Sequence, residues 1–153
     1  MDRNTDTRAD VMTAMRSCRL WRAADDDAVA RLAASATVED VPRGTTVAFE
    51  GEAAARLGVV VSGRARVFHL DADGRSLTFE VAGAGDPVGA VAALAGARYP
   101  ASVEAATPLT LAWIDREALF SLMDGQPAVA RSVIADLAGR LVEVGLAEDD
   151  LGR

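Results

Sequence analysis

The 153-residue sequence has one cysteine, Cys18, one histidine, His69, and no lysine. A single cysteine excludes an internal disulfide and any all-cysteine zinc or iron–sulfur site within one chain. With one histidine and no lysine, most general-base and Schiff-base chemistry lacks its usual side chains. Nucleophile-elbow, HExxH and Walker-loop motifs are also missing. The sequence therefore predicts a protein that is not an enzyme and holds no metal site of its own.

Long apolar runs and basic surfaces are also lacking. No run approaches the roughly 18 apolar residues that cross a bilayer, and the N-terminus has no apolar signal-peptide centre. The formal net charge of −7 argues against direct nucleic-acid binding by this chain. Half of the residues are hydrophobic, which is enough for one domain with its own core over residues 1–153. We expect a cytoplasmic domain that does not enter a membrane.

Two helices are expected at about residues 8–36. Apolar residues recur on one helical face from Arg8 to Cys18, and the polar residues before them are expected to fray. The acidic run Asp25–Asp27 is typical of a helix start, where carboxylates cap free amide groups and interact favourably with the helix dipole. Cys18 is interpreted as a small apolar helix residue, with a thiol redox sensor as the alternative.

Residues 37–114 consist of short β-prone runs separated by glycine turns. Because no helical period alternates with these runs, the pattern indicates a mainly β fold, an antiparallel jelly-roll β-barrel, rather than a parallel α/β sheet. Asp71–Gly74 is expected to form a hairpin turn. The expected strands are Thr45–Phe49, Leu57–Val61, Ala65–Leu70, Leu77–Val81, Ser102–Ala105 and Leu109–Ile114.

The helical period returns over residues 115–151. Asp115 is a suitable cap for a short helix through Met123, and Pro127 suits the first turn of a longer helix. Apolar residues three to four apart along the longer helix are typical of helices that pair, so we expect a homodimer. The alternative is that this stripe covers the barrel of its own chain. The predicted dimer seam consists of Ile134, Leu137, Leu141 and Val144.

The glycine turns occur in a distinctive order. They read Pro42-Arg43-Gly44-Thr45, Phe49-Glu50-Gly51-Glu52, Val59-Val60-Val61-Ser62-Gly63, Asp73-Gly74-Arg75, Ala84-Gly85-Asp86 and Val88-Gly89-Ala90. Together with the flanks Cys18–Trp21 and Ala101–Ala105, this order resembles the cyclic-nucleotide-binding effector domain of the CRP/FNR family of bacterial transcription regulators. The resemblance implies an effector pocket over residues 85–105 and a long C-terminal dimerisation helix.

The resemblance also implies which pocket groups are replaced. In the family, backbone amides at a helix N-terminus and one arginine hold the cyclic phosphate, and a glutamate binds the ribose hydroxyl. Ala90 stands at the glutamate position and Tyr99 at the arginine position, while Arg98 would point to the opposite face. We therefore do not expect cyclic AMP to bind in the usual mode, and Tyr99 is the expected plug of a filled pocket. The implied pocket residues are Gly85, Val88, Gly89, Ala90, Val91, Arg98, Tyr99, Pro100 and Ala101.

The sequence does not identify a small-molecule effector. A haem would need an axial ligand such as His69, Cys18 or a methionine, and alternation along the strand favours a solvated role for His69. The leading hypothesis is the effector-sensing and dimerisation domain of a CRP/FNR-type regulator. Its DNA contacts would lie in a helix-turn-helix domain absent from this chain. The alternatives are a stand-alone small-molecule-binding module, for a cyclic nucleotide or another effector, and a degenerate dimerisation scaffold.

Overall fold

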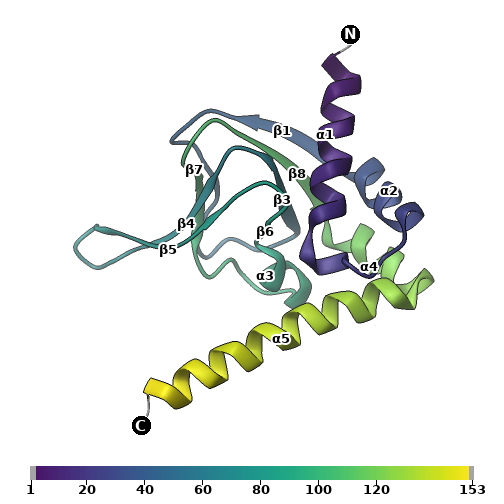
Figure 1. The fold of residues 1–153 in the computed structure, drawn as a ribbon. Coiled ribbons are helices and arrows are strands. Elements are labelled where there is room, and N and C mark those ends of the chain that lie inside the picture. The colour runs from purple at the N-terminus through teal and green to yellow at the C-terminus, as the bar shows by residue number, and fades with distance from the viewer. Residues whose placement is uncertain (1–2, 152–153) are drawn as a thin grey trace.

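The computed structural model describes the backbone of residues 3–151 and the side chains of residues 7–143 and 145. This part of the chain contains the strands β1 (Thr37–Val41), β2 (Thr46–Ala48), β3 (Arg56–Ser62), β4 (Ala65–Leu70), β5 (Ser76–Ala82), β6 (Pro87–Val88), β7 (Ser102–Ala105) and β8 (Leu109–Asp115). They form two 4-stranded antiparallel sheets, ordered β1-β8-β3-β6 and β2-β7-β4-β5, that pack as a sandwich (Figure 1). The predicted mainly β jelly roll with flanking helices is confirmed.

Six of these strands were predicted, with ends that agree closely, and two were missed. The first four residues of β1 are exposed, so the strand shows no alternation of buried and exposed residues. β6 is only two residues long and begins with a proline. The predicted hairpin turn at Asp71–Gly74 is confirmed, since the Asp71 amide donates to the Arg75 carbonyl over 2.8 Å.

The N-terminal helices are α1 (Arg3–Ser17), the 3₁₀ turn η1 (Arg19–Trp21) and α2 (Asp26–Ser35). Asp25 caps α2 as predicted, because its carboxylate accepts a hydrogen bond of 2.8 Å from the Ala28 amide. The prediction of frayed residues before Arg8 was wrong for residues 3–7, which belong to α1, while Met1 and Asp2 lie outside the described residues. Once a helix is nucleated, polar residues without a breaker extend it at little cost. Cys18 lies just beyond the end of α1 rather than within the helix, and it is fully buried.

Strand β3 is the centre of the core. It pairs with β8 on one side and β6 on the other, and α1 packs against it. Leu57, Val59 and Val60 are therefore fully buried, which explains a continuous apolar run rather than an alternating one. Gly63, with a φ of +83°, follows β3 in a turn so tight that a Cβ atom would lie 2.1 Å from the Pro108 carbonyl oxygen.

Two helices follow the sandwich, α4 (Arg116–Gly125) and α5 (Pro127–Leu151). Asp115 occupies the predicted cap position of α4, although its side chain makes no capping hydrogen bond. The first turns of α5 are anchored in the core through Val129 and Val133, and the rest of the helix runs past α3 (Ala90–Ala95) and away from the sandwich (Figure 1). No helix within residues 3–151 is both long and apolar enough to cross a membrane.

Candidate effector pocket

A cavity of about 180 Å³ lies where the segment around α3 meets the second sheet and α5. Seven of the nine predicted pocket residues line it: Val88, Gly89, Ala90, Val91, Tyr99, Pro100 and Ala101. The other two, Gly85 and Arg98, do not. Eight further residues line it: Pro87, Ala92 and Val103 from the predicted segment 85–105, and Leu20, Val67, Glu80, Leu137 and Arg140 from parts of the chain outside the predicted pocket.

Gly89 and Tyr99 lie next to each other in the wall of the cavity. Gly89 precedes α3 with a φ of +72°, a left-handed conformation that favours glycine. The Tyr99 side chain is only 8% exposed, and its hydroxyl donates a hydrogen bond of 2.6 Å to the Arg56 carbonyl. Burial raises the pKa of Tyr99 above its ordinary value, so the hydroxyl keeps the proton that it donates. The ring thus sits inside the pocket as an anchored aromatic plug.

Ala90 and Arg98 add no charge to the cavity. Ala90 is a buried methyl side chain at the first position of α3. Arg98 is exposed and its guanidinium donates a hydrogen bond of 2.7 Å to the Gly51 carbonyl. Since Tyr99 is buried and the preceding residue is exposed, the two side chains point to opposite faces, as expected for a one-residue shift in an extended segment.

Helix α5 forms one wall of this cavity through Leu137 and Arg140. Leu137, predicted to lie in the dimer seam, is partly buried against the core of its own chain. Ile134 and Leu141 lie on a different part of the helix and are 62% and 73% exposed. Val144 belongs to α5, but its side chain lies outside the described residues. The helix therefore has a pocket-facing side and an exposed apolar side.

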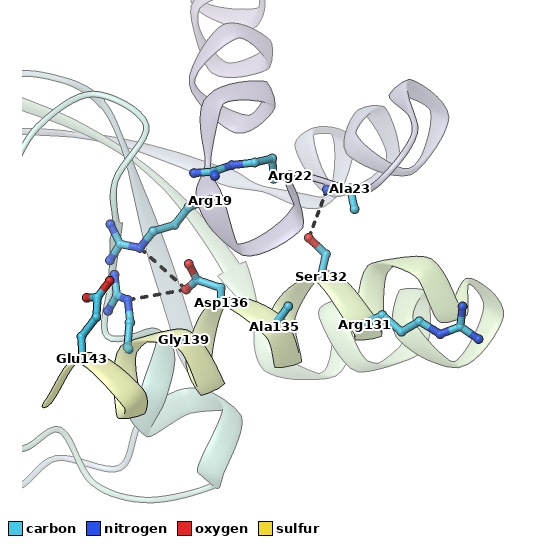
Figure 2. A pocket seen from close by; sticks show the side chains of 10 residues that line it. Arg19, Arg22, Ala23, Arg131, Ser132, Ala135, Asp136, Gly139 and Glu143 are labelled. Atoms are coloured by element: carbon cyan, nitrogen blue, oxygen red, sulfur yellow. Dashed lines mark hydrogen bonds and ion pairs between the residues drawn. The ribbon is translucent and has the colours of Figure 1, made fainter. Parts of the chain in front are cut away.

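A chain of charged groups joins α5 to the loop before the pocket. Asp136 Oδ2 lies 3.7 Å from Arg19 Nε and 3.5 Å from Arg140 Nε. Arg19 also reaches Asp86 at 3.6 Å, and the Asp86 carboxylate accepts a hydrogen bond of 2.9 Å from the Gly83 amide. Figure 2 shows Arg19 and Asp136 facing each other across the open groove of about 810 Å³ between α5 and the α1–α2 connection.

The contacts of Asp136 are long. Within the described residues, Arg19 Nε and Asp136 Oδ2 are buried atoms that have no hydrogen-bond partner, although they face each other. A neighbouring contact is tighter: the Ser132 hydroxyl accepts a hydrogen bond of 3.1 Å from the Ala23 amide (Figure 2). The first part of α5 is thus fixed to the α1–α2 connection, whereas the Arg19–Asp136–Arg140 group is loosely paired.

A model of the cyclic nucleotide-binding domain family matches residues 38–126. The chain belongs to this family. The match spans the whole sandwich, the segment around α3 and the short helix α4.

Curated relatives of this cyclic nucleotide-binding domain include a transcriptional regulator and a cyclic AMP receptor protein. The domain is 28% identical to the CRP-like cAMP-activated global transcriptional regulator of Mycobacterium tuberculosis, over 80% of this chain and 54% of that protein. It is 31% identical to the cyclic AMP receptor protein of Thermus thermophilus, over 71% of this chain and 50% of that protein. The Thermus thermophilus catabolite activator protein has the same fold, with a TM-score of 0.79 and 27% identity, covering 88% of this chain and 63% of that one.

The chain spans about half the length of the curated relatives it matches. The predicted membership of the CRP/FNR family is confirmed, and the chain is a CRP/FNR-type effector-binding domain.

His69 and Cys18, two of the side chains named as possible haem ligands, lie outside the cavity of this cyclic nucleotide-binding domain, and no methionine is among its described lining residues. His69 Nδ1 contacts a carboxylate oxygen of Glu50, and its ring packs edge-on against Phe79 with a centroid distance of 4.4 Å. Burial raises the pKa of the Cys18 thiol to about 12, so the thiolate needed for redox chemistry is not formed at neutral pH. The structure thus supports the interpretation of Cys18 as a small apolar residue over the redox-sensor alternative.

Proposed function

We propose that this chain is the effector-sensing and dimerisation domain of a CRP/FNR-type transcription regulator. The observation that carries the proposal is that α5 has two different sides. One side lines the cavity with Leu137 and Arg140, and the other exposes Ile134 and Leu141. A ligand that contacts the pocket side of α5 binds more tightly when the helix is in one orientation than when it is in another. It therefore shifts the population of helix positions and, with it, the geometry of a paired helix.

The exposed apolar side of α5 is assigned to a second copy of the chain. Ile134 and Leu141 are seven residues apart, and Ala138 lies between them on the same stripe. Leu137 is not placed in the seam, because it is partly buried against its own barrel. DNA recognition is assigned to another domain of the regulator, since the net charge of −7 offers no basic footprint.

The cavity does not fit a cyclic nucleotide bound in the usual mode. Ala90 has no carboxylate for a ribose hydroxyl, and Tyr99 has no positive charge for a phosphate. A buried phosphate without a cation beside it is strongly disfavoured, and the one cation among the described lining residues, Arg140, lies on α5 rather than in the segment 85–105. The volume of about 180 Å³ is also below the range of about 300–1,000 Å³ typical of drug-sized ligands. We infer that the effector is smaller than a nucleotide.

Isothermal titration with cyclic AMP and cyclic GMP tests this proposal. We expect no saturable heat up to millimolar nucleotide for the wild-type chain. The double variant Ala90→Glu, Tyr99→Arg, which restores the two family positions, is expected to gain binding of cyclic AMP. Micromolar binding of either nucleotide to the wild-type chain would contradict the proposed pocket.

A further inference from the structure

The cationic group at the cavity comes from α5. Among the described lining residues, Arg140 is the one cation, and the segment 85–105 contributes none. We propose that the cavity binds a small, mainly apolar monocarboxylate of about the size of benzoate, and that Arg140 binds its carboxylate group. This inference rests on the proposed function, in which the cavity is the effector site.

The size and lining of the cavity define the apolar part of the ligand. Apart from Glu80, Arg140 and the Tyr99 hydroxyl, the lining side chains are hydrocarbon, and Gly89 exposes only backbone. An apolar cavity of about 150 Å³ is known to accept benzene, so about 180 Å³ suits one aromatic ring or a short aliphatic chain with a small polar group. Burial of this ring or chain away from water supplies the hydrophobic, non-directional part of the binding affinity.

The geometry of Arg140 leaves donors for a ligand. Its ion pair with Asp136 uses Nε, at 3.5 Å, and within the described residues its two terminal nitrogens have no other ion-pair partner. The side chain is 39% exposed, and it lines both this cavity and the neighbouring open groove. A guanidinium is a planar fork of donors that matches a carboxylate and holds it with paired hydrogen bonds.

The charges at the rim favour a monoanion over a more highly charged ligand. Glu80, on the exposed edge strand β5, is the one carboxylate among the described lining residues. Arg140 supplies a single positive charge, and Glu80 and Asp136 lie near it, so each additional negative charge on a ligand, as in a phosphate dianion or a dicarboxylate, adds repulsion that no second cation offsets. A cyclic nucleotide is also a monoanion, so the cavity volume of about 180 Å³, rather than charge, separates it from the proposed ligand.

Binding of a ligand at Arg140 would act directly on the ion pairs that hold α5. Asp136 is shared between Arg140 and Arg19, and Arg19 also contacts Asp86 in the loop before the pocket. A ligand carboxylate on the terminal nitrogens of Arg140 neutralises charge that otherwise attracts Asp136, so it weakens this ion pair and changes the balance of the loosely paired group. Because Asp136 and Arg140 both lie on α5, ligand binding and helix position are coupled.

Isothermal titration with two acids and their uncharged amides tests the inference. The ligands are benzoate, hexanoate, benzamide and hexanamide, titrated into the full chain. We expect each acid to bind about tenfold or more tightly than its amide, the effect of a charged hydrogen-bonded pair. Arg140→Gln should remove this preference, and Arg140→Lys should retain part of it. Arg131→Gln is the matched control, since it removes an α5 arginine that does not line the cavity.

Three outcomes would overturn the inference: equal binding of acid and amide, a preference for the acid that survives Arg140→Gln, or no binding by either acid. Thermal unfolding of each variant establishes that it is folded. None of these outcomes decides the proposed function, which is tested separately by the nucleotide titration and by the association of α5.

Discussion

Gly89 lies so close to the Tyr99 ring that the glycine position has no room for an added carbon atom. A Cβ atom built on Gly89 would lie 2.8 Å from Cε1 of the Tyr99 ring, and the φ of +72° already disfavours any other residue. The start of α3 and the aromatic plug of the cavity are therefore fixed by one contact.

Gly89→Ala is expected to destabilise the chain by about 1–3 kcal/mol, from the left-handed backbone and the overlap with the ring. Urea unfolding measures this change. In a Tyr99→Ala background the same substitution should cost less, because only the backbone contribution is left.

Gly139→Ala is the matched control for this substitution. Gly139 lies within α5 with nothing near its Cβ position, so alanine should leave stability unchanged or raise it by up to about 1 kcal/mol. Equal stability of Gly89→Ala and the wild-type chain would show that the contact with Tyr99 does not exist.

Ser132→Ala is expected to loosen the anchoring of α5. The buried Ser132 hydroxyl accepts the hydrogen bond of the Ala23 amide, which would be left without this partner. We expect a loss of about 1–3 kcal/mol in the free energy of unfolding. Ser121→Ala, at an exposed position of α4, should change stability by less than about 0.5 kcal/mol. Similar effects of the two substitutions would argue against the anchor.

Alkaline pH is expected to destabilise the fold through Cys18. Burial raises the pKa of this thiol from 9.0 to about 12. Above pH 9 the unfolded chain loses the proton while the folded chain keeps it, so stability falls as pH rises toward 12. The expected loss is about 2 kcal/mol between about pH 8 and about pH 10.5.

Comparison with Cys18→Ala isolates this effect, because Tyr99 also has a raised pKa and contributes a loss in the same direction. Urea unfolding in the presence of a reductant should show a smaller alkaline loss for the variant, whatever its stability at neutral pH. Equal pH dependence of the two proteins would mean that the Cys18 thiol ionises in the folded state.

Much of the fold was predictable because its signals are local. Glycine turns separate β-prone runs, so six strands and the hairpin turn at Asp71–Gly74 could be placed from the sequence. The Asp25 cap of α2 was predicted for the same reason. β1 and β6 were missed because exposure along β1 and the two-residue length of β6 leave no pattern to read.

The pocket was predictable only along its own segment. Ala90 and Tyr99 belong to a motif, but Glu80 and Arg140 reach the cavity through the packing of β5 and α5, which no sequence spacing encodes. Leu137 shows the same limit. Its spacing on α5 is compatible with either side of the helix, and packing against the barrel of its own chain determines on which side it lies.

Helix α5 is proposed to pair two chains through its exposed side while its other side faces the pocket. Sedimentation equilibrium over micromolar concentrations tests this most directly. We predict a wild-type dimer that dissociates on Leu141→Asp, because one charge in the apolar seam opposes pairing. The dimer should persist on Phe49→Asp, a substitution of another exposed apolar residue. A wild-type monomer at high micromolar concentration, or a dimer unchanged by Leu141→Asp, would contradict the claim.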